Sequence, residues 1–334
     1  MFRVAFPDTG KLKAFLSVNE SDFIDVVYHG DVMLFITNTN EVFASLAVPA
    51  QTTDSNCDFS CRVYAKILSS ITDDTVIEFS EKKDGTVEMR FMHVSGYLYY
   101  SCSFLKQVVF TTSYQDKIDL ISAPPEGTEI QTDKFAEMIR VAKSSGTFIS
   151  IDSGVAAVLL RGGQRIYKKI GGPSSFAITG TSMVALRKCN HTIFNTQNYL
   201  LAKLDNFCVL TKKVIAQPND EYAILVSKEY KAKCVFEVNL ANVMKFLNTF
   251  SSEVTGVTID VSSQKCELET SYAKFYLNTE INNLRIADGM QPDELVIPTK
   301  ILKNVFNQFR TTEFMVKQKK NYTQFEKGDF LVVW

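Results

Sequence analysis

Apolar and polar positions along this chain repeat one small unit six times: an apolar strand, a short amphipathic helix, and then several more strands. The last unit shows the pattern most clearly. Residues 293–298 (DELVIP) predict a strand, and residues 299–309 place apolar side chains on one face of a helix. Three segments of strand length follow, at residues 313–318, 321–325 and 330–333. Repetition of one unit along a chain predicts that the units pack side by side.

The five earlier units follow the same plan. In the first helix Leu12, Phe15 and Leu16 lie at spacings i, i+3 and i+4, and in the second helix residues 63–71 carry apolar side chains at a spacing of four. After the first helix, which begins near residue 9, the predicted helices are residues 63–71, 132–144, 181–189, 239–250 and 299–309. The other predicted strands are residues 2–6, 25–28, 32–37, 42–48, 75–80, 86–92, 97–104, 155–160, 165–170, 175–179, 234–238, 256–261, 266–270 and 273–279, with three short strands between 192 and 210.

Two turn-rich breaks divide the six units into pairs. The breaks are residues 124–127 (PPEG) and 218–220 (PND), and a chain of 334 residues is too long for one ordinary core. We therefore predict an α+β protein of three repeated domains, each built from two strand–helix–strands units. The predicted domains are residues 1–122, 123–229 and 230–334.

The composition is that of a globular protein, with 46% hydrophobic and 22% charged residues. The net charge is −1, which argues against a protein whose whole surface is coated with Lys and Arg. A near-neutral chain can still sort its charges, with cations on one surface and carboxylates on another.

Seven cysteines are scattered without paired spacing, and most lie in apolar strand-like runs. This usage is typical of free thiols in a reducing compartment. The first residues lack the long apolar core of a signal peptide, and the longest apolar run, residues 155–160, is too short to span a bilayer. We expect a cytoplasmic protein that does not enter a membrane.

Motifs for catalysis are weak. Cys57 and Cys61 are separated by three residues, but no histidine stands at a spacing that would complete a zinc site. Ser80 and Lys83 match part of a β-lactamase motif inside a charged hairpin, and residues 162–163 (GG) lack the Lys and Ser/Thr of a phosphate-binding loop. We predict no metal, no cofactor and no enzymatic activity.

All six predicted helices carry Lys or Arg outside their apolar faces, where acids are few and Glu137 is an isolated exception. For any single helix, such cations simply solvate the outer face. Taken together, they predict a shared positive surface suited to phosphate groups. The cations have no interleaved aromatic residues, which favours duplex over single-stranded nucleic acid.

This succession of elements resembles the bacterial-type DNA sliding clamp, the β subunit of the replicative DNA polymerase III. The resemblance covers essentially the whole chain and rests on six repeated units, three domains, basic helices and a final strand at residues 330–334 (FLVVW). It implies the DNA clamp fold and a head-to-tail homodimer whose twelve helices surround duplex DNA. The implied function is that of a processivity factor that tethers the polymerase, with clamp-loader peptides as further partners.

The resemblance also implies which residues face the DNA backbone, independently of sequence. They are Lys11, Lys13, Arg62, Lys66, Lys134, Arg140, Lys143, Arg187, Lys188, Lys245, Lys300, Lys303 and Arg310.

A pocket for partner peptides is implied between the second and third domains. In place of the family's T-D-G-H-R-L motif, this chain has residues 161–166 (RGGQRI). The implied pocket residues are Arg161, Gly163, Gln164, Arg165, Ile166, Pro218, Leu225, Val332 and Trp334. Arg161 and Gln164 depart from the family pattern, as a clamp from a phage or a mobile element could do. From the residues alone, the terminal segment is either an ordinary last strand or an aromatic contribution to a peptide groove.

Two other functions remain open at this point. One is a clamp-fold scaffold or inhibitor that does not close a ring, and the other is a β-rich enzyme whose site has no recognisable motif.

Overall fold

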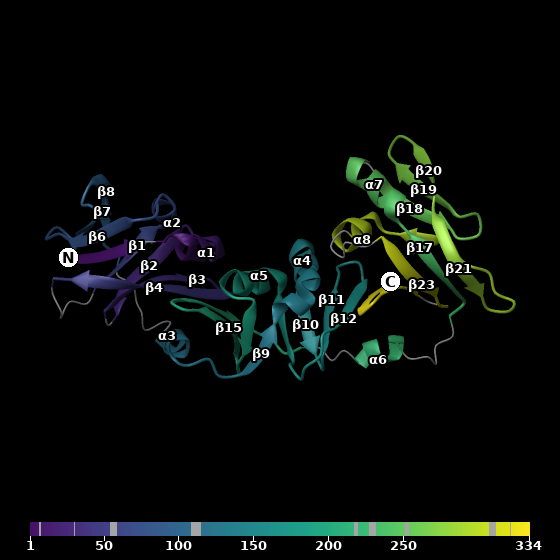
Figure 1. The fold of residues 1–334 in the computed structure, drawn as a ribbon, viewed down its shortest axis with the longest axis horizontal. Coiled ribbons are helices and arrows are strands. Elements are labelled where there is room, and N and C mark those ends of the chain that lie inside the picture. The colour runs from purple at the N-terminus through teal and green to yellow at the C-terminus, as the bar shows by residue number, and fades with distance from the viewer. Residues whose placement is uncertain are drawn as a thin grey trace. The chain divides into compact units, whose positions relative to one another are not determined.

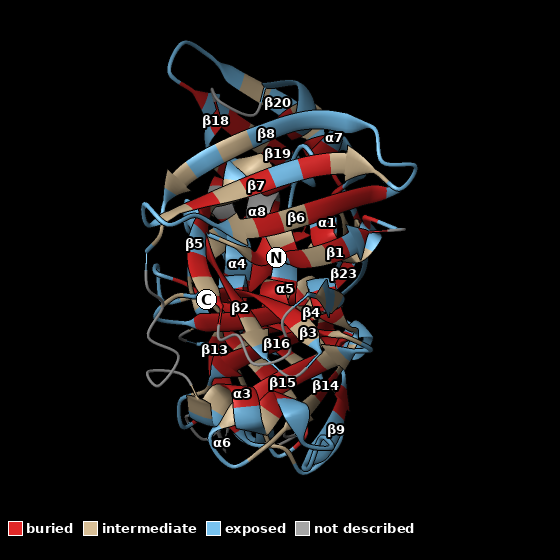
Figure 2. Cartoon of the chain, turned by 90° about the vertical axis from the view of Figure 1, so that its left-hand side faces the viewer, coloured by how far each residue is buried: buried red, intermediate tan, exposed pale blue. Residues whose placement is uncertain are grey.

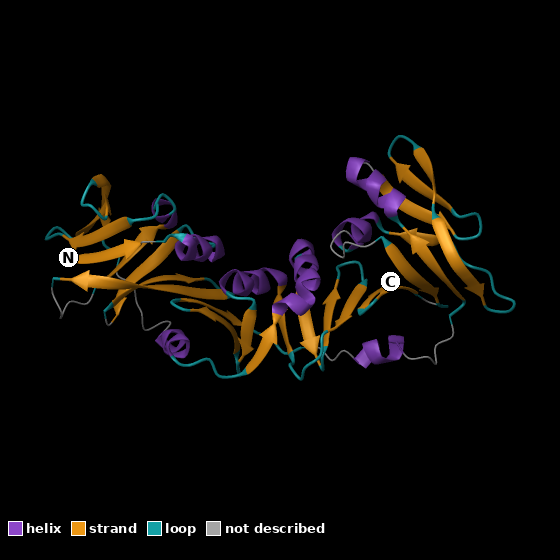
Figure 3. Ribbon diagram, viewed as in Figure 1, coloured by secondary structure: helices purple, strands orange, loops and turns teal. Residues whose placement is uncertain are grey.

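The computed structural model describes residues 1–6, 8–29, 31–53, 59–107, 115–216, 220–226, 232–250, 254–306, 312–320 and 322–334, with only the backbone for residues 220, 300, 303 and 304. The chain forms two compact units. The first contains residues 1–133 and 182–213, and the second contains residues 134–181 and 214–334. Strands predominate over helices in both units (Figure 3), so the predicted α+β class is confirmed.

The first unit is built on one antiparallel sheet of twelve strands. Its strands are β1 (Phe2–Phe6), β2 (Phe23–His29), β3 (Val32–Asn38), β4 (Val42–Thr52), β5 (Ser60–Tyr64), β6 (Thr75–Glu81), β7 (Thr86–His93), β8 (Leu98–Leu105), β9 (Thr128–Gln131), β14 (Thr192–Asn195), β15 (Tyr199–Leu204) and β16 (Phe207–Lys212). The main path runs β8-β7-β6-β1-β4-β16-β15-β14-β9, and β2, β3 and β5 branch from β4. The long strand β4 therefore joins the strands of the N-terminal segment to those of residues 192–212.

Helices cover both faces of this sheet (Figure 1). They are α1 (Gly10–Val18), α2 (Ala65–Leu68), α3 (Gln115–Ser122) and most of α5 (Gly180–Cys189). Helices α1, α2 and α5 lie on one face, where Phe15 packs edge-on against Phe207 with ring centroids 6.3 Å apart. Helix α3 lies on the other face and buries Ile118 and Ile121 against strand residues such as Leu210. Burial of these apolar stripes on the sheet stabilises the unit.

The second unit contains a sheet of nine strands and a sheet of four. Its strands are β10 (Phe148–Asp152), β11 (Val155–Leu159), β12 (Arg165–Lys169), β13 (Phe176–Thr179), β17 (Cys234–Asn239), β18 (Val254–Asp260), β19 (Lys265–Thr270), β20 (Lys274–Asn278), β21 (Glu280–Ile286), β22 (Leu295–Ile297), β23 (Glu313–Gln318), β24 (Thr323–Lys327) and β25 (Phe330–Val333). The larger sheet has the order β13-β10-β11-β12-β25-β24-β23-β17-β21, and the smaller has β20-β19-β18-β22. The last strand of the chain thus pairs with β12, in the middle of the sheet.

In the part of the second unit that the structure describes, the α-helices are α4 (Ala136–Ser145), α6 (Asp220–Val226), α7 (Ala241–Phe250) and α8 (Thr299–Asn304). Helices α4, α7 and α8 lie on one side of the strands and α6 on the other (Figure 1), and α4 packs against α8. Phe306, just after α8, stacks on Phe314 of β23 with centroids 4.5 Å apart. At the start of α5, a Cβ on Gly180 would overlap the backbone nitrogen of Lys143, so only glycine permits this approach to α4.

The predicted helix at residues 63–71 is wrong in its first part. Helix α2 covers only Ala65–Leu68, because residues 60–64 form β5 and pair with β2. Cys61 and Val63 are buried while Arg62 between them is exposed, which is the alternation of a strand. A spacing of four also keeps residues on one face of a strand, so this spacing did not distinguish the two structures.

The other predicted helices are present, although the helix at residues 299–309 is described only as α8, and residues 307–310 lie outside the described part. The elements that the sequence analysis did not predict are α3, α6, β5, β9, β10 and β21. The division into three domains stays a prediction, because the two compact units follow different boundaries.

Candidate functional site

A cation of α5 links that helix to α1 in the first unit, and a cation of α1 contacts a turn of the sheet. Lys188 Nζ on α5 donates a hydrogen bond to the backbone carbonyl of Ser17 on α1. Lys11 Nζ on α1 lies 2.7 Å from Asp205 Oδ2 in the turn between β15 and β16. These contacts use part of the charge of two of the predicted helical cations, Lys11 and Lys188.

Both predicted arginines of the first unit are ion-paired. Arg62 lies on β5, not on a helix, and its Nε is 2.7 Å from Asp25 Oδ1. Arg187 Nη2 on α5 is 2.7 Å from Asp133 Oδ1. The hydrogen bond with His191 and, to a smaller degree, the Arg187 guanidinium hold the pKa of Asp133 below its ordinary value. Both arginines therefore have a carboxylate partner within the first unit.

A second group of predicted cations is exposed and makes no ion pair with any described residue. This group, which we call the open lysines, consists of Lys13 on α1, Lys66 on α2, Lys134 in the short helix η2 (Thr132–Phe135), Lys143 on α4 and Lys245 on α7. Lys13 lies close enough to Asp73 to help lower the pKa of that carboxyl, after the two hydrogen bonds from Thr9. The open lysines are the helical charges most available to a polyanion.

The remaining predicted cations belong to α4 and to the segment that begins with α8. Arg140 is exposed on α4. Lys300 and Lys303 lie on α8, where only the backbone is described, and Arg310 lies outside the described residues.

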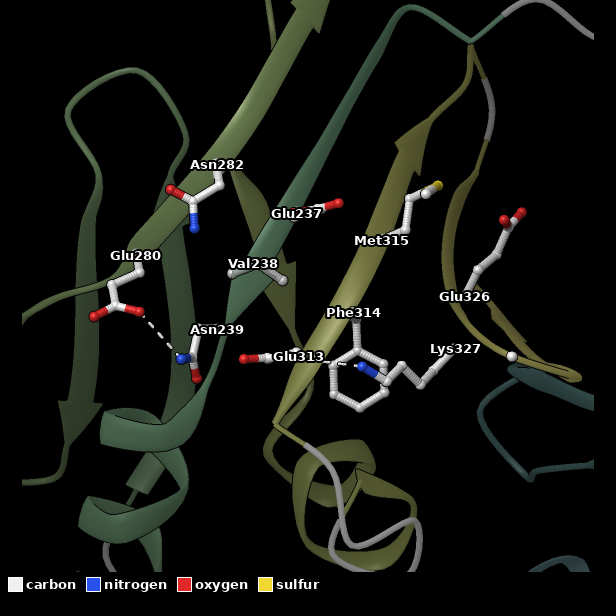
Figure 4. Close-up of a pocket in the computed structure, with 11 residues that line it drawn as sticks. Glu237, Val238, Asn239, Glu280, Asn282, Glu313, Phe314, Met315, Glu326 and Lys327 are labelled. Atoms are coloured by element: carbon white, nitrogen blue, oxygen red, sulfur yellow. Dashed lines mark hydrogen bonds and ion pairs between the residues drawn. The ribbon is translucent and has the colours of Figure 1, made fainter.

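Carboxylates gather on the face of the second unit that is opposite its basic helices. Glutamates of β17, β21, β23 and β24 line a hollow of about 490 Å³ (Figure 4): Glu237, Glu280, Glu313 and Glu326. Phe314, next to Glu313 in β23, is buried against Phe306 after α8, so the glutamates point away from that helix. Two of these glutamates are ion-paired, because Lys317 contacts Glu326 and Lys327 contacts Glu313.

A second hollow, of about 520 Å³, lies on the same face of the nine-stranded sheet. The side chains on its floor are small: they are Ala177, Ser150 and Ala157, which are paired directly across β13, β10 and β11. Tyr167 of β12 pairs with Ala157 and forms one wall. Residues paired directly across strands share a face, and this row continues through β25 to Glu326, at the acidic hollow.

Part of the wall of the second hollow is apolar, and two hydroxyl groups in the hollow have no hydrogen-bond partner among the described residues. Phe148, Leu159 and Ile215 line it and are 51%, 52% and 95% exposed. Thr147 Oγ1 and Ser150 Oγ are buried, and neither has a hydrogen-bond partner among the described residues. Such unpaired hydroxyls cost about 1–3 kcal/mol each unless a ligand or water satisfies them. Apolar walls with a few polar groups are typical of ligand sites.

Helix α6 borders this hollow and is held on the sheet mainly by Leu225. That side chain is buried in a cluster with Tyr167, Leu331 and Val333. The backbone carbonyl of Leu225 accepts a hydrogen bond from Gln324 Nε2 at 3.1 Å. These contacts fix the helix independently of its charged residues.

Three polar side chains meet where α6 reaches the hollow. The Arg165 guanidinium forms an ion pair with the carboxylate of Glu221 on α6. The Tyr167 hydroxyl donates to Glu221 Oε2 at 3.1 Å. Burial first, and then the Glu221 carboxylate, raise the pKa of Tyr167 to about 12, so this hydroxyl keeps its proton. Arg165 and Tyr167 together bind one carboxylate.

Of the predicted pocket residues, Arg165 alone lines the described hollow. Ile166 and Val332 are paired across β12 and β25 and are buried on the opposite face, because side chains alternate along a strand. Trp334 stacks on Phe325 with centroids 4.6 Å apart. Since Phe325 is buried and also packs on Phe306, the partly buried tryptophan packs against the core on the helix side of the sheet.

The other predicted pocket residues lie around the hollow or outside the description. Arg161, Gly163 and Gln164 form the turn between β11 and β12, Leu225 anchors α6, and Pro218 lies outside the described residues. The sequence analysis missed Phe148, Leu159, Ile215 and Glu221. The available signal was the alternation in β10, where Phe148 and Ser150 share one face and the buried Ile149 and Ile151 share the other.

Two general findings concern the described residues. No group of three or more His, Cys, Asp or Glu side chains there is placed to hold a metal ion. No helix there has the length and apolar character needed to cross a membrane.

Known proteins resemble this chain in structure and not in sequence. No family profile and no curated sequence matches the chain. Solved structures do match over its full length, each with 98% of its own chain covered. They include the DNA polymerase III β chain of Streptococcus pneumoniae (TM-score 0.72, 10% identity), the β subunit of Pseudomonas aeruginosa (0.69, 12%) and that of Thermotoga maritima (0.68, 12%).

These matches define the fold of the chain as that of the bacterial DNA polymerase III β subunits, which are also described as DNA polymerase sliding clamps. The predicted resemblance and the predicted clamp fold are therefore confirmed. At 10–12% identity, the likeness concerns the fold and not the individual site residues.

Proposed function

We propose that this chain is a DNA sliding clamp: a non-catalytic processivity factor whose two copies form a head-to-tail ring around duplex DNA and tether a replicative polymerase. The observation that carries the proposal is the clamp fold over the whole chain, combined with helices that present the open lysines. In this proposal the three domains at 1–122, 123–229 and 230–334 are the repeats of the ring. The free thiols at six described cysteines fit a cytoplasmic protein.

Duplex DNA would be held through its phosphates. The open lysines are long side chains on helices, and they can contact phosphates without a base-stacking aromatic residue. Contacts to phosphates carry no sequence information. Ion pairs such as Lys11–Asp205 and Arg187–Asp133 limit how many charges the DNA can use. A contact of moderate strength suits a ring that retains DNA by enclosing it and must still slide.

Ring closure would use the free edges of two sheets. Among the described residues, strand β8 pairs only with β7 at the end of the twelve-stranded sheet, and Figure 2 shows it more exposed than β7. Within the same described part of the chain, strand β20 pairs only with β19 at the end of the smaller sheet of the second unit. Both edges expose large side chains, including Leu98 (48%) and Tyr99 (45%) on β8 and Tyr276 (66%) on β20. Exposed edges of this kind favour pairing with another chain, so we propose that β8 of one copy pairs with β20 of the other.

The polymerase and the loader would dock through short peptides in the 520 Å³ hollow beside α6. Its exposed Phe148, Leu159 and Ile215 can bury apolar side chains of a partner.

A trapping experiment tests this proposal without a loader. The protein is mixed with a linear duplex biotinylated at both ends, streptavidin is added to block the ends, and the sample is passed through a gel-filtration column at 0.5 M salt. A ring is expected to remain on the blocked duplex and to leave after a restriction enzyme cuts it.

Two other results would count against a sliding ring. Equal retention on open and blocked duplexes would indicate ordinary electrostatic binding. Loss from both would favour the alternative of a clamp-fold scaffold or inhibitor that does not close.

A further inference from the structure

We infer that Arg165 and Tyr167 form a carboxylate-binding position in the wall of the hollow, that Glu221 of the chain's own helix α6 occupies it, and that the partner peptide is one whose acidic residue replaces Glu221. The inference rests on the proposed function, because it names the chemistry of the peptide that the hollow takes. It is carried by the ion pair of Arg165 with Glu221 and by the hydrogen bond from Tyr167 to the same carboxylate.

The Glu221 carboxylate can leave without unfolding α6. Arg165 and Glu221 are 44% and 46% exposed at their side chains, so water screens the pair and its contribution is small. The helix is held instead by the buried Leu225 side chain and by the hydrogen bond that its carbonyl accepts from Gln324. Rotation of the Glu221 side chain therefore opens the position while the backbone stays in place.

Other features of the hollow indicate that a ligand completes it. The buried hydroxyls of Thr147 and Ser150 lack partners among the described residues and lie with Arg165 in the same hollow. The exposed side chains of Phe148 and Leu159 stand beside them. A peptide would satisfy the hydroxyls with its backbone, cover the apolar walls with one or two large side chains, and present its carboxylate to Arg165.

The charge of the hollow disfavours a basic peptide only after the Glu221 side chain has moved. With Glu221 in place, a lysine of a peptide would find a carboxylate at the wall. With Glu221 displaced, Arg165 prefers an acid, because the guanidinium and the protonated Tyr167 hydroxyl are both donors. Whether the hollow binds acidic or basic peptides more tightly can therefore be measured.

A random heptapeptide library displayed on phage provides the probe. It is selected in parallel against the full-length wild type and against Arg165→Ala. We expect wild-type binders to be enriched in Asp or Glu next to a large apolar residue, and we expect this enrichment to disappear with Arg165→Ala.

A selected peptide and its Asp→Asn or Glu→Gln form are then titrated by fluorescence anisotropy. For Glu221→Gln we expect the acidic peptide to bind about three-fold more tightly, as a surface ion pair of ordinary strength would allow, and the neutral form to be unchanged. Glu20→Gln, at an exposed glutamate of the first unit, is the matched control and should change neither.

The outcomes separate this inference from the proposed function. Apolar binders without acidic residues, or an acidic preference that Arg165→Ala leaves intact, would overturn the carboxylate position and leave a peptide-binding clamp. Enrichment of Lys or Arg would show that Glu221 itself recognises the partner, which also overturns it. If Leu159→Asp weakened the binding of none of the selected peptides, that result would instead count against the hollow as the docking site.

Discussion

At the scale of single residues, an ion pair limits how far a helical cation could contribute to the proposed contact with DNA. Lys11 and Lys13 are two positions apart on α1, yet Lys11 contacts Asp205 at 2.7 Å while Lys13 makes no ion pair with a described residue. Lys143 on α4 is exposed in the same way as Lys13. An amphipathic pattern predicts only that such side chains lie outside the core. It does not predict their ion-pair partners, because these come from distant segments of the chain.

Replacing an open lysine should change the salt dependence of DNA binding. For Lys143→Gln we expect the slope of log affinity against log salt concentration to fall by about 0.9, the value for one lost phosphate contact. Fluorescence anisotropy with a labelled duplex at several salt concentrations measures this slope. Lys11→Gln should have a smaller effect, because Asp205 already offsets its charge.

Lys83→Gln, in the exposed turn between β6 and β7, is the matched control and should leave the slope unchanged. Equal slopes for Lys143→Gln and the control would remove Lys143 from the DNA contact.

At the scale of elements, the sequence predicted long, periodic segments well and short ones poorly. Helices α1, α4, α5 and α7 have an apolar stripe that pattern alone identifies. Strand β5 was assigned to a helix because a spacing of four fits both structures, and pairing with β2 decided between them. Helix α6 has only seven residues, and its position depends on a cluster contributed by β12 and β25. No local pattern contains that information, so the hollow beside α6 could not be predicted in detail.

The junction of β13, α5 and α4 should be sensitive to one added methyl group. In Gly180→Ala the Cβ would overlap the backbone of Lys143, which cannot move as a side-chain end can. We expect a loss of about 2 kcal/mol in the free energy of unfolding, typical of overpacking, measured by urea denaturation. Gly256→Ala is the control, because its Cβ would meet nothing nearer than Glu269 Oε2 at 3.9 Å. Equal midpoints for the two variants would contradict the close approach.

At the scale of the whole molecule, repetition was the most informative property of the sequence. Six similar units predicted the clamp fold, and solved β subunits match the chain over its full length at 10–12% identity. Conserved motifs could not have shown this, because residues 161–166 keep little of the family pattern. In the proposed ring, the contacts between copies would use β8 of the first unit and β20 of the second.

The central claim, that two copies close a ring, is tested most directly by sedimentation equilibrium at micromolar concentration. The account predicts a mass of about 75 kDa, twice the 37.6 kDa of one chain. Tyr276→Asp on β20 should shift this mass toward the monomer, while Met315→Asp, an exposed apolar position on the interior strand β23, should not. A mass of one chain for the wild-type protein would contradict the ring.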